Sequence, residues 1–399
     1  MVTRTYTITE KDFPSACTDA IELIQNEPLL RSGVFFDIET TGFSPASCAL
    51  YLMGCCTFDG RHWQLTQWMA EDESLEEQRM VLEHFLKAIE NAPAIISYNG
   101  TTFDLPFIEK KCMQAGLSPD FSRWNHVDLY KEVRSLKTLL SLENLKQKTV
   151  ERFLGIYRED TYSGGALIPI YKAYVKNHTS AMEDLLLLHN FEDIKDMLFI
   201  LPVLAYRRVL YDGDVSLCRD PKSQFPATGD AHSPGAAVAG TQKPCTGNSF
   251  SVTLTPKLAL PAALPEKVLP LPGKPELALK LCVRPGQLRL DLPLIQGEMK
   301  YFYDNFKDYY YLPQEDYAIH KSIAAYVDKD CRKKATAKTC YTKKTGVFLP
   351  QPEKIISPAF KRQYEDKVLW FEYRQTLWDD PDFLSAIQRF LRLFVQGSF

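Results

Sequence analysis

Three features that would place a protein in a membrane, in the secretory pathway or among zinc-binding proteins are missing from this sequence. It has no apolar run near the roughly 20 residues that a membrane-spanning helix needs. Its first nine residues contain no apolar signal-peptide core. Its ten cysteines include no Cys-x-x-Cys pair of the kind that holds zinc. We therefore expect a cytoplasmic protein with reduced thiols and no membrane partner.

Two carboxylates stand where a predicted core strand ends. Residues 33–36 are apolar and β-prone, and Asp37 and Glu39 follow them. Residues two apart in a strand point to the same face, so both carboxylates project side by side. Oxygen ligands of this kind suit Mg²⁺ or Mn²⁺, and burying both acids without a cation would be costly. The alternative is a solvated acidic turn after the strand.

Two further acids lie at other element ends. Asp104 follows a short apolar strand at 94–98 and stands where a helix would begin, so it could also be a simple N-cap. Asp193 lies four residues after His189 on a predicted helix, which places both on one helix face. Such a pair is also common as a surface contact. Together with the first pair, these residues suggest a four-acid set.

In this order and spacing, the acids resemble the three motifs of the DEDD exonuclease superfamily, and most closely the YprB-type RNase H-like domains. The resemblance covers residues 33–210, about half of the chain. It implies an RNase H-like fold and a metal-dependent nuclease, specifically a 3′→5′ exonuclease acting on DNA or RNA, with single strands or 3′ ends as partners. The segments that carry it are 36–42, 98–100, 103–104, 145–155, 158–160, 164–171 and 189–193.

The resemblance also implies a ligand set for two Mg²⁺ or Mn²⁺ ions. Asp37 would bridge both ions, Glu39 and Asp193 would complete the first site, and Asp104 would help to hold the second. Two ions of this kind can serve the attacking and the leaving oxygen of a phosphodiester bond.

His189 departs from the superfamily pattern. One branch of the superfamily has a His five residues before the last Asp, and another has a Tyr four residues before it. Here a His stands four residues before Asp193, which suits the YprB-like group. An imidazole titrates near neutral pH, so we predict that His189 is a general base. The alternative is that it only orients a ligand through a hydrogen bond.

Residues beside the motifs are candidates for substrate contacts. Backbone amides after the first acids could meet a terminal nucleotide, and a Tyr-Asn pair could pack against a sugar or base. An arginine could reach a phosphate, although a solvated surface arginine is an equal alternative. These candidates are Thr40, Thr41, Gly42, Tyr98, Asn99 and Arg158.

The hydrophobic pattern predicts an α/β fold with a mixed five-stranded RNase H-like sheet and flanking helices. Three strands joined as hairpins precede two strands that alternate with helices, and the chain to about residue 210 is then helical. The expected strands are 33–39, 50–58, 62–69, 94–98 and 126–129, and the first two helices are 73–91 and 105–115.

The chain divides into an RNase H-like domain at 1–211, a linker at 212–250 and a smaller α+β domain at 251–399. The linker is rich in Gly, Pro, Ser and Ala without a hydrophobic period, so we expect it to be flexible. In the last domain we expect a hairpin over 277–292 and helices over 315–327 and 383–394.

The two ends of the chain differ in charge. Residues 251–399 hold 23 Lys and Arg against 17 Asp and Glu, whereas residues 1–250 hold 24 against 33. Cations interleaved with tyrosines after residue 300 could bind nucleic acid, although an aromatic core edge beside a solvated basic loop is an equal alternative. Two other function classes stay open: an RNase H-like nucleic-acid-binding protein that has lost catalysis, and an adaptor that docks through its basic region.

Overall fold

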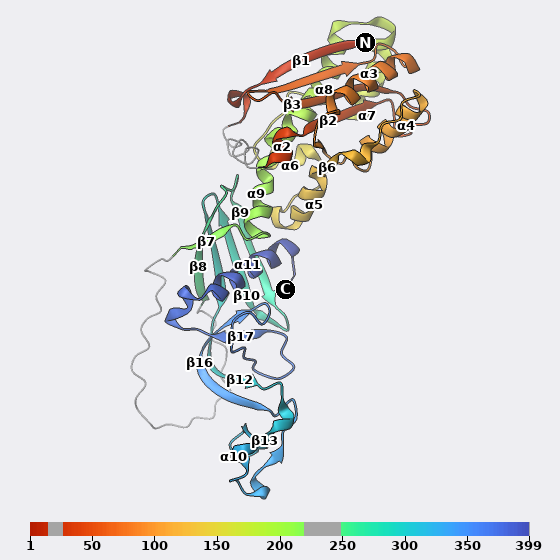
Figure 1. Cartoon of the computed structure of the whole chain (residues 1–399). Coiled ribbons are helices and arrows are strands. Elements are labelled where there is room, and N and C mark those ends of the chain that lie inside the picture. The colour runs from red at the N-terminus through yellow and green to blue at the C-terminus, as the bar shows by residue number, and fades with distance from the viewer. Residues whose placement is uncertain (15–26, 219–248, 399) are drawn as a thin grey trace. The chain divides into compact units, whose positions relative to one another are not determined.

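The computed structural model describes residues 1–14, 27–218 and 249–398 (Figure 1). The backbone forms two compact units, one comprising Met1–Arg207 with Ala259–Ala262 and the other Arg208–Leu258 with Ala263–Phe399. Within the described residues, no helix has the length and apolar character needed to cross a membrane.

The first unit is built on a mixed sheet of six strands. Their order is β1-β4-β3-β2-β5-β6, with β5 and β6 parallel to β2 and the other neighbours antiparallel. This confirms the predicted mixed sheet and the succession of three hairpin-joined strands followed by two crossover strands. The strands are β1 (Val2–Ile8), β2 (Val34–Thr40), β3 (Leu50–Phe58), β4 (Trp63–Met69), β5 (Ala94–Ser97) and β6 (Asn125–Asp128).

The sixth strand is a correction to the five predicted from the sequence. Strand β1 pairs along its whole length with β4 and forms an edge of the sheet. Its residues are mostly polar and exposed, with only Ile8 fully buried. An edge strand of this kind is held by its backbone pairing more than by a buried face, so it lacks the apolar alternation on which the prediction relied.

Helices cover both faces of this sheet. On one face, α3 (Leu75–Ile89) and α4 (Asp104–Gln114) share a core with alternate residues of β2 such as Phe36 and Ile38. On the other, α7 (Gly164–Asn177) and α8 (Ser180–Phe199) pack on Tyr51 and Met69. Asp37 and Glu39 alternate with the residues of the first core and therefore face α8. The remaining helices are α2 (Pro28–Ser32), α5 (Leu129–Leu140), α6 (Gln147–Phe153) and α9 (Leu204–Leu210).

The second unit consists mainly of antiparallel sheets. Five strands form one sheet in the order β7-β8-β11-β10-β9, and two three-stranded sheets follow, β12-β16-β17 and β14-β13-β15. The strands are β7 (Val215–Cys218), β8 (Ser249–Pro256), β9 (Leu264–Leu271), β10 (Lys274–Arg284), β11 (Gln287–Pro293), β12 (Ile295–Phe302), β13 (Tyr309–Leu312), β14 (Tyr317–His320), β15 (Lys333–Lys334), β16 (Tyr341–Gln351) and β17 (Leu369–Glu372).

Some local predictions for this unit hold and others do not. The hairpin of β10 and β11 and the amphipathic helix α11 (Pro381–Gln396) are where the sequence places them. The helix predicted over 315–327 is wrong. Strand β14 occupies its first half and pairs with β13, and only the short α10 (Lys321–Ala324) is helical. Asp316, in a left-handed turn at φ 57°, lets the chain reverse between the two strands.

Strands occupy parts of both ends of the predicted linker. Strands β7 and β8 pair with each other and include residues 215–218 and 249–250. These residues alternate buried and exposed side chains, as strands of a one-sided sheet do. The rest of the predicted linker, 219–248, lies outside the described residues.

Candidate active site

Residues from β2, α4 and α8 meet at the face of the sheet that α8 covers. Asp37 and Glu39 come from β2, Asp104 is the first residue of α4, and His189 and Asp193 lie one turn apart on α8. The four acids are close enough to repel one another, because the charges of Asp193 and Asp104 raise the pKa of both Asp37 and Glu39. The structure therefore brings the predicted acids and His189 into one cluster.

A close approach of α8 to the sheet makes this cluster possible. Gly54 of β3 lies under α8, where an added Cβ would be 2.4 Å from Asn190 Oδ1 and from Ile194 Cδ1. The Asn190 amide Nδ2 donates to Asp37 Oδ2 at 3.0 Å, and its Oδ1 accepts from Gln67 Nε2 at 2.8 Å. Asn190 and Gln67 are fully buried. Their hydrogen bonds hold α8 close to the sheet, a role that the sequence analysis missed for both residues.

Three acids of the cluster, Asp37, Glu39 and Asp104, hold protons more tightly than ordinary carboxyl groups. Burial, followed by repulsion from neighbouring carboxylates, raises the pKa of Asp37 and of Glu39 well above the usual range. Burial also raises the pKa of Asp104 to about 7, although backbone N–H groups at Asp104 and Ile38 oppose the shift. A divalent cation would relieve this repulsion by binding the ionised carboxylates.

His189 is held between three carboxylates. Its Nδ1 lies 2.6 Å from Asp160 Oδ2, and its Nε2 lies 3.5 Å from Glu39 Oε1 and 3.3 Å from Asp193 Oδ2. Burial alone would raise the pKa of Asp160, but hydrogen bonds from Lys148, the Tyr162 backbone and His189 lower it overall. Asp160 is within a segment that carries the family resemblance, yet nothing in its local pattern indicated a partnership with His189.

Arg158 is buried and contacts Asp193, one of the acids of the cluster. Its side chain is 4% exposed and makes paired hydrogen bonds to Glu151, with Nη1 also donating to Asp193 Oδ1 at 2.5 Å. Its Nε lies 3.5 Å from Asp196 Oδ2. Burial alone would lower the pKa of the guanidinium, but Glu151 and Asp193 raise it overall. The structure thus gives Arg158 carboxylate partners, and its contact with a phosphate stays a prediction.

Much of the polar surface of the other predicted substrate residues is used within the protein. Thr41 Oγ1 accepts from the Ala49 N–H, and the Thr41 N–H donates to the Ala49 carbonyl. Thr40 Oγ1 donates to the carbonyl of Gly42. Their proposed contacts with a nucleotide stay predictions.

Tyr98 and Asn99 support the turn that leads to α4. The Tyr98 hydroxyl donates to the Leu145 carbonyl at 2.7 Å, and the Asn99 N–H donates to Asp128 Oδ1 at 2.8 Å. Asn99 adopts a left-handed conformation with φ 69°, which asparagine tolerates better than most residues. Contacts of this pair with a sugar or base also stay predictions.

Exposed aromatic rings border the motifs and were missed in the sequence. Phe43, directly after Gly42, is 90% exposed and makes an edge contact with Phe103, whose ring centroid is 6.1 Å away. Tyr157, directly before Arg158, is 81% exposed. Every nucleobase has a face on which such an exposed ring can stack.

The residues present fit divalent cations. Glu39, His189 and Asp193 offer ligand atoms that all lie within 4.8 Å of one another. Asp37 and Asp104 add carboxylates to the same cluster. Carboxylate oxygens with one imidazole nitrogen form a donor set suited to Mg²⁺, Mn²⁺ or Zn²⁺.

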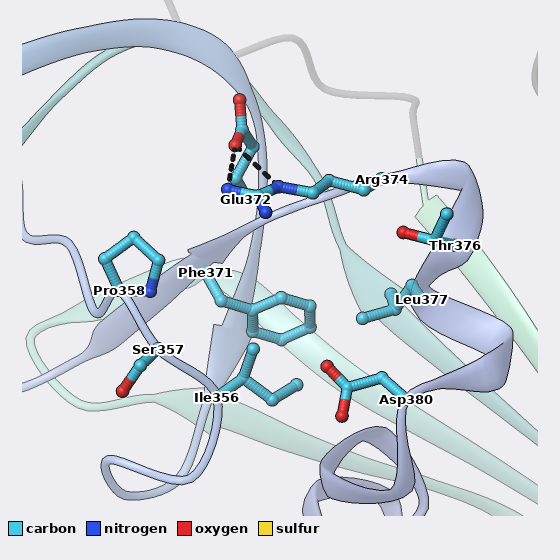
Figure 2. Close-up of a pocket in the computed structure, with 9 residues that line it drawn as sticks. All are labelled: Ile356, Ser357, Pro358, Phe371, Glu372, Arg374, Thr376, Leu377 and Asp380. Atoms are coloured by element: carbon cyan, nitrogen blue, oxygen red, sulfur yellow. Dashed lines mark hydrogen bonds and ion pairs between the residues drawn. The ribbon is translucent and has the colours of Figure 1, made fainter.

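The second unit contains a small pocket of a different kind (Figure 2). Phe371, Ile356 and Leu377 line its apolar part. Its charged groups are already engaged, because Glu372 pairs with Arg374 and the Asp380 carboxylate caps α11. The pocket therefore offers little to a charged ligand.

The basic and aromatic residues of the second unit partly pair among themselves. Lys300 Nζ lies 4.1 Å from the centroid of the Tyr341 ring, and Lys343 Nζ lies 2.6 Å from Asp316 Oδ2. Lys333 and Lys334 of β15 are exposed. Nucleic-acid binding by this unit stays a prediction, supported by its excess of positive charge.

The cluster should make the stability of the metal-free protein depend on pH. A carboxyl group whose pKa is raised on folding binds protons more tightly in the folded than in the unfolded protein. The resulting stabilisation is full below an unfolded pKa of about 4 and is lost as pH rises through the folded pKa, about 7 for Asp104. We expect the free energy of unfolding in EDTA to fall by about 2 kcal/mol between pH 5 and pH 8.

Urea denaturation at pH 5, 6.5 and 8, with EDTA and with Mn²⁺, measures this fall. Mn²⁺ should remove most of it, and Asp104→Asn should make the fall in EDTA smaller, while Asp37 and Glu39 account for what remains. A free energy that rises steadily from pH 5 to pH 8 in EDTA would contradict the expected repulsion among the acids.

Comparison with known proteins supports the fold of the first unit. Residues 34–205 match a family described as the RNase_H superfamily. This match confirms the RNase H-like fold predicted from the sequence, whereas the YprB-type assignment stays a prediction. No curated protein sequence gives a significant match.

Solved structures with a similar fold include a polymerase and an exonuclease. The family B DNA polymerase of the archaeon Pyrobaculum calidifontis is 18% identical, with a TM-score of 0.36 over 44% of this chain and 25% of that one. Exonuclease I of E. coli in complex with a dT13 oligonucleotide is 16% identical, with a TM-score of 0.27 over 39% and 43%. A product-bound exonuclease I is 13% identical, with a TM-score of 0.28 over 46% and 48%. The chain thus spans between a quarter and about half of the length of these proteins.

Proposed function

We propose that this protein is a metal-dependent nuclease of the YprB-like type that removes nucleotides from the 3′ end of DNA or RNA. The observation that carries this proposal is the convergence of four acids from three elements on one cluster, in which the pKa values of Asp37, Glu39 and Asp104 are raised. Buried carboxylates that repel one another are costly to the fold unless a cation offsets their charge. Carboxyl groups with perturbed pKa values also cluster at functional sites.

The carboxylates have distinct places in this proposal. Asp37, which interacts with all three other acids, would be a ligand shared by two cations. Glu39 and Asp193 would help to hold one of these cations, and Asp104 would help to hold the other. Bound Mg²⁺ or Mn²⁺ would neutralise charge on the scissile phosphate and promote attack by water.

The residues that flank the motifs suit a single-stranded end of a nucleic acid. The exposed ring of Phe43 follows the first motif, and the exposed ring of Tyr157 precedes Arg158. Stacking on such rings needs bases that have left a duplex. We therefore propose single-stranded 3′ ends as the preferred substrate.

Cleavage of end-labelled oligonucleotides tests the proposal. The full-length protein is incubated with 5′-labelled single-stranded DNA or RNA in the presence of Mg²⁺, Mn²⁺ or EDTA. We expect a ladder that shortens one nucleotide at a time, only with a divalent ion and only on one of the two nucleic acids or preferentially on it. A matched substrate with a blocked 3′ end should resist cleavage.

Other outcomes would point elsewhere. Internal fragments from the blocked substrate would indicate an endonuclease. Salt-sensitive binding without cleavage under any condition would favour a catalytically inactive nucleic-acid-binding protein, and the absence of both would favour an adaptor.

A further inference from the structure

The two ring nitrogens of His189 have different partners. Nδ1 faces Asp160, whereas Nε2 faces Glu39 and Asp193. The imidazole is 5% exposed, so water cannot replace these partners freely. The distribution of protons on the ring therefore follows from the protein groups around it.

Asp160 determines which nitrogen carries the proton. Its Oδ2 accepts from Lys148 Nζ at 2.8 Å, and its Oδ1 accepts from the Tyr162 N–H at 2.9 Å. A carboxylate with these donors is an acceptor toward His189 as well, so Nδ1 donates to it over 2.6 Å. In the neutral ring, the lone pair is then on Nε2 and points at two carboxylate oxygens.

Three electron-rich atoms that face one another need a positive charge between them. Around a cation with ligands at about 2.0–2.2 Å, neighbouring ligand atoms lie about 2.8–3.1 Å apart in an octahedral site and about 3.3–3.6 Å apart in a tetrahedral one. His189 Nε2 lies 3.3 Å from Asp193 Oδ2 and 3.5 Å from Glu39 Oε1, close to these spacings. Gly164, at the start of α7, borders the same space without a side chain, since a Cβ there would be 3.6 Å from Glu39 Oε2.

We propose that His189 is a direct nitrogen ligand of the divalent ion held by Glu39 and Asp193, and that Asp160 anchors its ring. This inference rests on the proposed function and specifies one of its metal sites. A carboxylate that accepts the second N–H of a ligating histidine fixes the orientation of the ring and strengthens its donor nitrogen. Asp160, supported by Lys148, is in that position.

The inference changes the role predicted for His189. A nitrogen that donates its lone pair to a cation cannot also accept a proton. A His189 side chain bound to the ion would therefore not act as a general base. A nitrogen ligand also changes the preferred ion, because imidazole favours Mn²⁺ or Zn²⁺ over Mg²⁺. The site should therefore bind Mn²⁺ more tightly than Mg²⁺.

Electron spin-echo spectroscopy of bound Mn²⁺ tests the ligand directly. The metal-free full-length protein is titrated with Mn²⁺, and modulation from a coordinated ¹⁴N is recorded without any nucleic acid. We expect the ¹⁴N modulation in the wild type and in the control variant His178→Asn, which changes a histidine at the end of α7. It should vanish in His189→Gln.

A second variant tests the anchor without removing the ring. Asp160→Asn should weaken Mn²⁺ binding by about 10–100-fold, as substitutions of second-sphere partners do. An unchanged Mn²⁺ affinity in Asp160→Asn would overturn the anchoring role. Circular dichroism should confirm that each variant is folded.

The outcomes separate this inference from the proposed function. Tight Mn²⁺ binding without ¹⁴N modulation in the wild type would overturn nitrogen ligation and leave the nuclease proposal intact. Failure of the wild type to bind Mn²⁺ at all would overturn both.

Discussion

Replacing Asp37 with asparagine is expected to lower the rate of metal-dependent phosphodiester hydrolysis by about 10³-fold or more. Asparagine has nearly the same shape, and its Oδ1 can still accept the hydrogen bond that Asn190 Nδ2 now gives to Asp37. What it lacks is the negative charge needed to bridge two cations. The loss should therefore appear in catalysis and metal binding without a loss of structure.

The same substitution should stabilise the metal-free protein. Burial and the charges of Asp193, Asp104 and Glu39 raise the pKa of Asp37, so its ionised form is costly at pH 8. Removing that charge should raise the free energy of unfolding in EDTA by about 1 kcal/mol or more. A gain of stability together with a loss of activity is typical of a residue selected for function.

Thermal unfolding with EDTA and with Mn²⁺ measures both effects beside the cleavage assay. The matched control is Asp184→Asn, which changes an exposed aspartate on the same helix as Asp193. We expect Mn²⁺ to raise the melting temperature of the wild type and of the control, and to change that of Asp37→Asn much less. Full activity in Asp37→Asn would exclude the bridging role.

The sequence predicted the sheet well because its central strands carry strong local signals. Apolar runs and a Gly-containing turn marked β2, β3 and β4. The spacing of Asp37 and Glu39 fixed their common face by the geometry of a strand alone. Strand β1 has no such signal, since its pairing with β4 involves exposed polar residues at an edge.

The site was only partly predictable, because its supporting contacts join distant segments. Gln67 and Asn190 are 123 residues apart, and His189 and Asp160 are 29 apart. Each of these polar residues is compatible with an ordinary surface position when read locally. Their burial and pairing arise only when α8 packs against β4 and against the segment that holds Asp160, and hydrophobic periodicity gives no sign of such polar contacts.

The role of Arg158 could likewise not be read from its local sequence. The guanidinium could support the buried carboxylates or bind a substrate phosphate, and these two roles predict different results for one substitution. Replacing it with methionine keeps the length of the side chain but leaves Glu151, which is 1% exposed, without its cationic partner, and leaves Asp196 with Lys195 alone. Breaking a buried ion pair by removing one partner costs about 3–5 kcal/mol. We expect urea denaturation to show a loss of this size for Arg158→Met.

Matched variants separate structural support from substrate binding. Arg152→Met, on the exposed side of α6, should change the free energy of unfolding little. Adding Glu151→Gln to Arg158→Met should recover part of the loss, because it removes the carboxylate that accepts two hydrogen bonds from the guanidinium. If Arg158 instead binds a substrate phosphate, Arg158→Met would raise KM and leave stability unchanged. The guanidinium is enclosed by carboxylates, so a phosphate could reach it only by displacing Asp193, and this is why we expect the loss of stability.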